Sequence, residues 1–201
     1  MSSDTAFVLA TRNPHKVGEL AALLAPGRLE PLPPEVELPP ETADTFAANA
    51  TIKARAAAEA TGRAALADDS GIVAAALGGA PGVRSARFAG EQASDEENLA
   101  KLLREVPEDG DRRVAYVCVL SLVEPGKDEL HLFEGRCEGT LAAEPRGEGG
   151  FGYDPAFVPA DLDGERTMAE LDPREKDAIS HRGRAVRALR AWLGERERVA
   201  R

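Results

Sequence analysis

Long apolar runs are absent from this sequence, no secretory signal is apparent in it, and cysteine is rare. No stretch approaches the ~20 apolar residues that a membrane-spanning helix needs, and the first residues, MSSDTAFVLA, lack the basic and apolar segments of a secretory signal. The two cysteines, Cys118 and Cys137, fall on two predicted strands of one hairpin, about three residues out of register and roughly 10 Å apart, which is too far for a disulfide. We therefore expect a soluble, cytoplasmic protein with two reduced, buried thiols and no membrane partner.

Positive charge is scarce as well. The chain carries 25 Lys and Arg against 35 Asp and Glu, a formal net charge of −10, and its isoelectric point is near 4.9. This balance argues against a general nucleic-acid-binding protein, which needs a basic surface, although a few local cations could still hold a small anion. Only 5 of the basic residues are lysines, so each one is a candidate for a specific role: Lys16, Lys53, Lys101, Lys127 and Lys176.

What is present predicts one globular domain. The 201 residues are 43% hydrophobic and 30% charged, which excludes a disordered or collagen-like chain and fits a single domain over residues 1–201. Strand and helix patterns follow one another in mixed order, which indicates an α/β fold with a mixed, twisted central sheet and flanking helices. The elements we expect are a strand at 7–10, a helix capped by Asn13 with Pro14 at its first position, a helix from Asp44 or Thr45 to Thr61 stopped by Gly62, a strand at 63–67 that ends in Asp68–Gly71, a helix from Ser94 or Asp95 to Arg104, a hairpin of strands 114–123 and 129–138, and a helix from about Ser180 whose arginines point mostly outward.

Residues 11–16 follow the first predicted strand directly and open a helix. Backbone N–H groups at a helix N-terminus, together with the Thr11 hydroxyl, the Asn13 amide and the Lys16 ammonium, suit a chain of phosphates. An ordinary N-capped helix explains the same residues without a ligand.

Two adjacent carboxylates, Asp68 and Asp69, stand at the end of a predicted strand and are followed by Ser70 and Gly71. Mg²⁺ prefers one or two carboxylates together with water and phosphate oxygens, and either aspartate could orient or deprotonate a water molecule. Glu41, just before the second helix, is a further candidate ligand. A polar turn is the alternative interpretation.

A glycine-rich loop at 149–155 contains Phe151 and Tyr153. Glycine lets a backbone approach a planar ligand closely, and aromatic rings stack on such a ligand. A plain hairpin loop is the alternative.

Lys176, His181 and Arg182 place three potential cations within seven residues of an acidic chain. Such a group could bind phosphate or the keto oxygens of a base. A solvated helix start would explain these residues equally well.

Taken together, the four stretches predict a protein that binds a nucleotide and cleaves it with water and the help of a metal ion. No Walker-type glycine–lysine motif and no local Ser–His–Asp or His–Cys arrangement occurs, so we do not expect a covalent nucleophile. Two other classes of function stay open. A nucleotide-binding regulatory module without turnover would not need Glu41, Asp68 and Asp69 together, and an RNA-binding protein could use the seven arginines between residues 180 and 201, although the net charge of −10 argues against it.

In this order the stretches resemble the Ham1-type inosine triphosphate pyrophosphatases, also called noncanonical purine NTP pyrophosphatases. The resemblance runs from about Phe7 to Leu193 and rests on TRNPHK at 11–16, ETADTFAANATIKAR at 41–55, ADDSGI at 67–72, GGAPGVRSARFAG at 78–90, GGFGYDPAFVP at 149–159 and KDAISHRGRA at 176–185. It implies an elongated mixed α/β fold with two lobes around a nucleotide cleft, usually as a homodimer. It also implies Mg²⁺-dependent hydrolysis of ITP, dITP and XTP to the monophosphate and pyrophosphate, which cleanses the nucleotide pool of deaminated purines.

The resemblance also assigns roles to single residues. Glu41 and Asp69 would bind Mg²⁺, and Asp69 would be the water-activating base with Asp68 in support, although which aspartate is the base stays open. The substrate-binding stretch would be Thr11, Arg12, Asn13, Pro14, His15 and Lys16, in which Thr11, Asn13 and Lys16 hold the triphosphate while Arg12 and His15, at variable positions of the family, receive no separate role. The other substrate-binding residues would be Lys53 near the phosphates, Ser70, and, around the base and sugar, Phe151, Gly152, Tyr153, Asp154, Lys176, His181 and Arg182.

Overall fold

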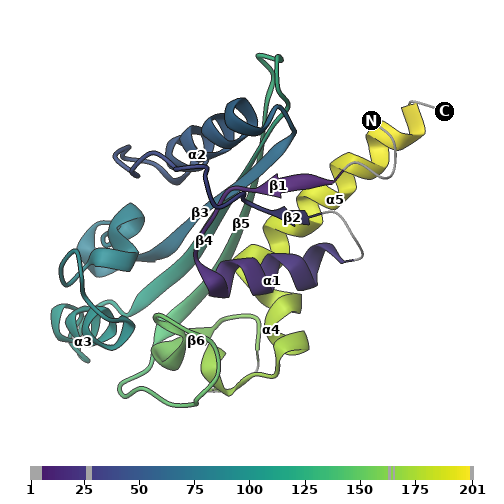
Figure 1. Ribbon diagram of the computed structural model, residues 1–201. Helices are drawn as coiled ribbons and strands as arrows, with labels where there is room; N and C mark the ends of the chain where they lie inside the picture. Colours follow the sequence, from purple (N-terminus) through teal and green to yellow (C-terminus); the bar gives the residue numbers. More distant parts are fainter. Residues whose placement is uncertain (1–5, 26–28, 163, 165, 200–201) are drawn as a thin grey trace. The chain divides into compact units, whose positions relative to one another are not determined.

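The computed structural model describes residues 6–25, 29–162, 164 and 166–199, which form a sheet with flanking helices (Figure 1). The strands are β1 (Phe7–Leu9), β2 (Leu29–Pro31), β3 (Ala65–Ala74), β4 (Arg113–Val123), β5 (Leu130–Leu141) and β6 (Phe157–Pro159). The helices are α1 (Pro14–Leu24), α2 (Phe46–Thr61), α3 (Asp95–Glu105), α4 (Pro173–Ile179) and α5 (His181–Val199), and the short 3₁₀ turns are η1 (Ala75–Leu77), η2 (Gly82–Arg87), η3 (Asp154–Ala156) and η4 (Met168–Glu170).

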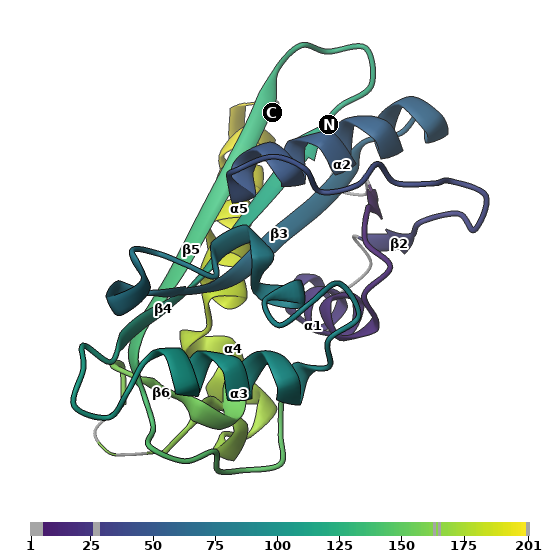
Figure 2. The same ribbon diagram turned by 90° about the vertical axis from the view of Figure 1, so that its left-hand side faces the viewer.

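The strands join one sheet in the order β2-β1-β3-β4-β5-β6. β1 is parallel to both β2 and β3, whereas β6 is antiparallel to the end of β5, so the sheet is mixed. β4 lies in the interior of the sheet beside the long strand β5 (Figure 2), and every residue of β4 after Arg113 is buried. A strand covered on both faces has a nearly continuous apolar sequence, and the sequence of β4 is of this kind. The α/β class with a mixed sheet and flanking helices is therefore confirmed.

The chain divides into two compact units. The first consists of Met1–Asp69, Cys118–Gly135 and Arg182–Arg201, and the second of Ser70–Val117 and Arg136–His181. The long strands β3, β4 and β5 each contribute residues to both units. A single functional domain over residues 1–201 stays a prediction.

Strand alternation gives the first unit two apolar layers. Successive side chains of a strand point to opposite faces, so Leu66 packs in a cluster with α1 and α5, while its neighbours Ala65 and Ala67 pack with α2. The side of α2 that faces the sheet is built from small residues, of which Ala54 and Ala57 are fully buried. Small side chains let the α2 backbone lie close to the sheet, which brings its few polar side chains near β3.

Three helix starts are set by capping residues that the sequence predicted. Asn13 caps α1 by accepting hydrogen bonds from two backbone N–H groups of the first turn, with a proline following it. Thr45 caps α2, which ends at Gly62 in the left-handed conformation with φ of 65°. Ser94 and Glu97 form a capping box at α3. Each cap satisfies N–H groups that have no partner inside the helix, so these boundaries follow from local chemistry.

The second unit has its own core. It combines residues of α3 and of the ends of β4 and β5 with the segment after β5, and among them Leu102, Tyr116, Phe157 and Met168 are almost fully buried. The rings of Tyr116 and Phe157 stack with their centroids 4.4 Å apart. Cys118 and Cys137 are both buried and form no disulfide, which confirms the prediction of two buried thiols.

The sequence placed the end of β3 wrongly. The strand does not stop before Asp68 but continues through Asp69, Ser70 and Gly71 to Ala74. Gly71 is required here for close packing and not for flexibility, because a Cβ at this position would lie 2.3 Å from the side-chain oxygen of Ser85.

The C-terminal end of the chain differs from the sequence-based expectation in one element. The sequence did not indicate the short helix α4, which precedes α5. The arginines of α5 point mostly outward as predicted, with Arg187, Arg190 and Arg198 exposed, whereas Arg182 is 1% exposed and its guanidinium pairs with acidic side chains inside the first unit.

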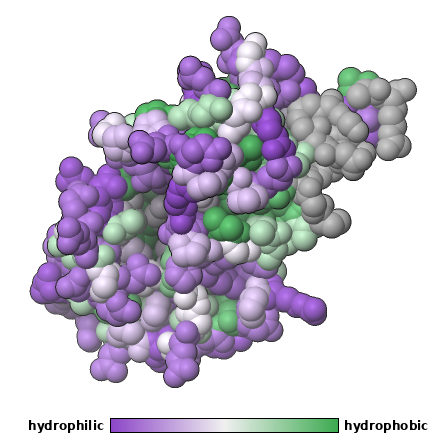
Figure 3. All heavy atoms as spheres, in the orientation of Figure 1, coloured by the Kyte–Doolittle hydropathy of each residue, from purple (hydrophilic) through white to green (hydrophobic). Residues whose placement is uncertain are grey.

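No helix in the described ranges has both the length and the apolar character needed to cross a membrane. The face of the molecule drawn in Figure 3 is dominated by hydrophilic side chains, with smaller apolar areas between them.

Candidate active site

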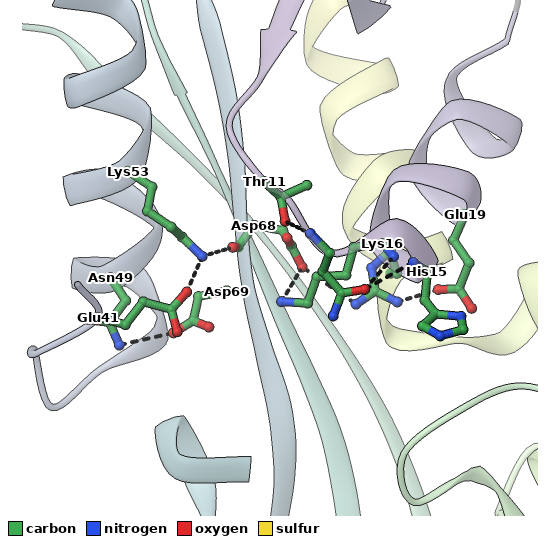
Figure 4. A network of polar contacts seen from close by, with 11 residues as sticks. Thr11, His15, Lys16, Glu19, Glu41, Asn49, Lys53, Asp68 and Asp69 are labelled. Atoms are coloured by element: carbon green, nitrogen blue, oxygen red, sulfur yellow. Dashed lines mark hydrogen bonds and ion pairs between the residues drawn. The ribbon is translucent and has the colours of Figure 1, made fainter. Parts of the chain in front are cut away.

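Asp68 and Asp69 are neighbours in β3 that serve opposite faces of the sheet. Asp68 follows Leu66 by two residues and therefore points to the side of α1 and α5, whereas Asp69 follows Ala67 and points to the side of α2. The contacts of the two side chains agree, because Asp68 forms an ion pair with Lys16 of α1 and Asp69 accepts a hydrogen bond from Asn49 of α2 (Figure 4).

Cations surround Asp68. Its carboxylate is fully buried and lies 3.1 Å from the Lys16 ammonium and 3.5 Å from the Arg182 guanidinium. Arg182 also forms an ion pair with Glu19 of α1. Burial by itself would raise the pKa of Asp68, but the charges of Lys16, Arg182 and Lys53 outweigh it and hold that pKa well below its usual range. Asp68 is therefore a permanent carboxylate.

Asp69 has the opposite electrostatic environment. Burial and the charge of nearby Glu41 raise the pKa of Asp69 to about 6, against the smaller opposing effects of Lys53, Lys16 and a hydrogen bond from Asn49. The Asn49 side chain donates that bond to Asp69 Oδ2 at 3.0 Å. A carboxyl group whose pKa lies near neutrality can take up a proton more readily than an ordinary aspartate.

Asn49 uses all of its polar atoms. Besides Asp69 it contacts both backbone groups of Ala43, as its Oδ1 accepts from the N–H at 2.9 Å and its Nδ2 donates to the carbonyl at 3.2 Å. The side chain is fully buried. Asn49 therefore ties the segment that carries Glu41 to α2 and to Asp69.

Lys53 stands one turn further along α2, on the same face as Asn49. Its ammonium donates to the Glu41 carboxylate and, at 2.6 Å, to the backbone carbonyl of Asp68. Burial lowers the pKa of Lys53, but the charges of Asp68 and Glu41 more than compensate, so the pKa lies above its usual value. Lys53 is a fixed cation between the two carboxylate environments (Figure 4).

The donor set around Asp69 fits a small divalent cation. Within the described residues, no group of three or more His, Cys, Asp or Glu side chains forms a metal cage. Glu41 is nevertheless close enough to Asp69 that its charge raises the pKa of Asp69. Two mutually repelling carboxylates suit Mg²⁺, which takes one or two protein carboxylates and fills its other positions with water and phosphate oxygens.

The α1 N-terminus places the first predicted stretch on the surface of the first unit. Thr11 Oγ1 accepts from the backbone N–H of Asn13 at 3.2 Å, and the exposed residues Pro14 and His15 form the first turn. Arg12 does something that the sequence did not indicate, since its guanidinium donates to backbone carbonyls of the proline-rich segment at Pro33, Pro34 and Val36, at distances between 2.8 and 3.1 Å.

A second cluster lies in the second unit and is centred on Asp154. This buried carboxylate accepts hydrogen bonds from the backbone N–H of Phe151 at 2.9 Å, from the Lys176 ammonium at 2.8 Å and from the Tyr116 hydroxyl at 3.0 Å. Lys176 also lies over the Phe151 ring, 5.1 Å from its centroid. The His181 ring stacks on Tyr116 with centroids 4.6 Å apart.

The glycines of this loop serve the loop itself. Gly150 has a φ of 72°, and a Cβ there would lie 2.1 Å from the Asp154 carboxylate, so only glycine permits this turn. Gly152 donates its N–H to Asp95 at 2.8 Å, and the buried Tyr153 donates its hydroxyl to the Ser85 carbonyl at 2.7 Å. The close approach that glycine permits is therefore seen within the loop, between the backbone at Gly150 and the side chain of Asp154.

The structure thus groups the predicted site residues into two clusters. Lys16, Glu41, Lys53, Asp68, Asp69 and Arg182 lie together in the first unit, with Thr11, Asn13 and His15 at the adjoining helix start. Phe151, Gly152, Tyr153, Asp154, Lys176 and His181 lie in the second unit, as does half-buried Ser70, which directly follows Asp69 in β3.

Sequence reasoning gave no role to three residues that the structure places in these clusters. Asn49 was noticeable as a polar side chain in an alanine-rich helix, and Glu19 lies one turn after Lys16, so both carried a signal. The sequence signal for Tyr116 was weak, because it consists only of a single tyrosine hydroxyl within an apolar strand.

The fold and the clusters together define an α/β protein whose carboxylates and cations suit metal-assisted phosphoryl chemistry, and known proteins resemble the chain in sequence and in fold. The Ham1 family pattern matches residues 7–192. A dITP/XTP pyrophosphatase of Coxiella burnetii (strain RSA 493 / Nine Mile phase I) is 48% identical over 199 residues, which cover 94% of this chain and 96% of the relative. Another, of Symbiobacterium thermophilum, is 52% identical over 192 residues, or 92% of each chain. A solved HAM1 protein structure from Coxiella burnetii is similar with a TM-score of 0.86 at 45% identity, over 95% of this chain and 99% of that one. The chain belongs to the Ham1 family.

Proposed function

We propose that this protein hydrolyses noncanonical purine nucleoside triphosphates, namely ITP, dITP and XTP, to the nucleoside monophosphate and pyrophosphate. The observation that carries the proposal is the Asp68–Asp69 pair in β3, with Lys16 and Lys53 fixed beside it. Its relatives at 46–52% identity are named dITP/XTP pyrophosphatases, which supports the choice of substrate. The biological result is a nucleotide pool cleared of deaminated purines.

Glu41 and Asp69 are the residues that would hold Mg²⁺. When bound, the ion supplies charge to neutralise phosphate oxygens and orients them for an in-line displacement. The mutual repulsion of the two carboxylates in the metal-free chain supports this assignment, because a cation between them removes it.

Asp69 is the better candidate for the water-activating base. Asp68 is committed to ion pairs with Lys16 and Arg182, whereas Asp69 lies on the other face of the sheet beside Glu41, where the metal would be held. Asp68 then has a different task, which is to fix Lys16 and Arg182 by charge.

Lys16 and Lys53 would take up the charge that develops on the leaving pyrophosphate. An ammonium is a compact charge with three donors and can follow a phosphate oxygen as its charge grows, whereas a planar guanidinium demands a fixed geometry. The backbone N–H groups and the Thr11 hydroxyl at the start of α1 add neutral donors for the same chain of phosphates.

The cluster around Asp154 would recognise the base. Inosine and xanthine carry an oxygen at C6 where adenine carries an amino group, and Lys176 and His181 offer donors that match the oxygen. A site of buried donors can reject the wrong base by about 10⁴, because an amino group leaves those donors unpaired. Arg182 was assigned to the base by resemblance, yet its guanidinium lies against Asp68 and Glu19, so we assign it first to the phosphate side. A homodimeric state and a cytoplasmic location belong to the same proposal.

A product assay tests the function. With Mg²⁺, wild-type protein should release pyrophosphate and no orthophosphate from XTP, and a chelator should abolish the release. Asp69→Asn should lower kcat by about 10² to 10⁴, the range for loss of an acid–base group, whereas Asp111→Asn, an exposed carboxylate paired with Arg113, should leave it unchanged. Orthophosphate as the product, or normal turnover by Asp69→Asn, would contradict the proposal.

A further inference from the structure

Tyr116 carries a hydroxyl into an otherwise apolar stretch of β4. The side chain is 6% exposed, and the hydroxyl donates to Asp154 Oδ1 at 3.0 Å in a buried hydrogen bond. A tyrosine hydroxyl needs a partner when it is buried, so the bond explains how the residue is accommodated. It does not explain why this position of the core has a hydroxyl at all.

The two oxygens of the Asp154 carboxylate accept hydrogen bonds from different groups. Oδ1 accepts from Tyr116, while Oδ2 accepts from the Lys176 ammonium at 2.8 Å and from the Phe151 N–H at 2.9 Å. With one oxygen held by Tyr116, the carboxylate plane cannot turn, and Oδ2 stays aimed at Lys176 and Phe151.

The ring of Tyr116 acts on the same cluster from a second direction. It stacks on His181 with centroids 4.6 Å apart and planes inclined by 15°, and on Phe157 with centroids 4.4 Å apart. Tyr116 therefore contacts His181 through its ring and reaches Lys176 and Phe151 through Asp154. All of these residues belong to the second unit.

We propose that Tyr116 is a positioning residue for base recognition, which sets the orientation of the Lys176 ammonium and of the Phe151 ring through the Asp154 carboxylate. This inference rests on the proposed function, in which Lys176 faces the base. The lysine side chain is a flexible four-carbon stem, so its ammonium selects between an oxygen and an amino group only when a fixed acceptor holds it in place. Tyr116 supplies the rigidity that the lysine lacks.

The direct test removes one oxygen atom. Tyr116→Phe keeps the ring and its stacking but leaves Asp154 Oδ1 without this donor. We expect KM for ITP and XTP to rise about tenfold, which corresponds to one buried hydrogen bond, with kcat changed less than about threefold, and the preference for ITP over ATP to fall by a similar factor. Unchanged KM values and an unchanged preference would overturn the proposal.

A double-mutant cycle tests whether the effect of Tyr116 on base recognition is transmitted through Asp154. If Tyr116 acts through Asp154, Tyr116→Phe should have almost no further effect on KM in an Asp154→Asn background, whereas independent roles would give multiplying effects and contradict the proposal. Asp154→Asn alone should also raise KM more than it lowers kcat, so the proposal stays testable even if Tyr116→Phe does not fold.

Ser121→Ala is the matched control. Ser121 lies in the same strand, is fully buried and also loses a hydroxyl, which reaches only Thr51 in the first unit at 3.4 Å. Its kinetic constants should match those of the wild type, whatever change occurs in melting temperature. Binding of inosine monophosphate, measured by calorimetry, tests the role of Tyr116 separately from the proposed hydrolysis. Tyr116→Phe should weaken the binding of this nucleotide about tenfold. A wild-type chain that binds this nucleotide but releases no pyrophosphate would refute the proposed function and leave the role of Tyr116 measurable.

Discussion

The pKa values of the adjacent carboxyl groups of Asp68 and Asp69 are shifted in opposite directions, because successive side chains of a strand point to opposite faces of the sheet. On one face Asp68 meets Lys16 and Arg182, and its pKa falls; on the other, burial and Glu41 raise the pKa of Asp69 to about 6. The sequence shows only two equal aspartates. Their difference in chemistry comes from the helices that cover the two faces.

The raised pKa of Asp69 has a consequence for stability in metal-free solution. An aspartate whose pKa is about 6 in the folded chain and near 3.8 in the unfolded chain penalises the folded state progressively as the pH rises from 4 to 6 and fully above that. Asp69→Asn should therefore raise the melting temperature by roughly 5 °C at pH 7.5 and by much less at pH 4.5. Added Mg²⁺ should shrink the gain at pH 7.5, because the ion compensates the charge of the wild-type residue. A gain of equal size at both pH values would contradict this account.

At the scale of elements, α2 is the support of the carboxylate pair. Its alanines bring the helix close to the sheet, and Asn49 and Lys53, one turn apart, reach from it to Asp69, Glu41 and the Asp68 carbonyl. One helix thus sets the positions of both expected metal ligands.

Asn49→Ala should weaken divalent-cation binding. The variant loses the bonds that hold the Glu41 segment and Asp69 in place, so we expect the dissociation constant for Mn²⁺, measured by electron paramagnetic resonance, to rise about tenfold. Thr61→Ala, at the far end of α2, removes a hydroxyl that donates only to the Ala57 carbonyl and serves as the control. Equal Mn²⁺ affinity in Asn49→Ala and the control would show that Asn49 does not position the ligands.

The elements differ in how far the sequence could predict them. The starts of α1, α2 and α3 were predicted correctly because a cap is a contact between residues two or three positions apart. The course of β3 was not, because two aspartates within a strand are stable only when partners from distant segments neutralise and bond them. Arg182 and Asp68, for example, are 114 positions apart. The motifs named most of the candidate residues, but only the fold shows which of them are in contact.

At the scale of the whole molecule, the chain is acidic, with a net charge of −10. The basic side chains to which we assign anion binding are concentrated in two clusters. The residues to which we assign phosphate binding, around Asp68 and Lys53, belong to one compact unit, and the residues around Asp154, to which we assign base recognition, belong to the other. Each cluster can therefore be altered by substitutions within its own unit.

This separation predicts two distinct kinetic phenotypes. Lys16→Ala should lower kcat/KM for ITP and ATP by the same factor, about 10² for loss of one electrostatic donor, and leave the preference between them unchanged. Lys176→Ala should instead compress the preference, because it removes a donor that distinguishes the C6 oxygen from an amino group. Steady-state rates with both nucleotides measure each effect, and a changed preference in Lys16→Ala would contradict the assignment.

The central claim is that water attacks the α-phosphorus of a deaminated purine nucleoside triphosphate. Hydrolysis of ITP in ¹⁸O-labelled water, followed by mass spectrometry of both products, tests it most directly. The account predicts one labelled oxygen in inosine monophosphate and none in pyrophosphate. Label in pyrophosphate would place the attack on the β-phosphorus and contradict the account.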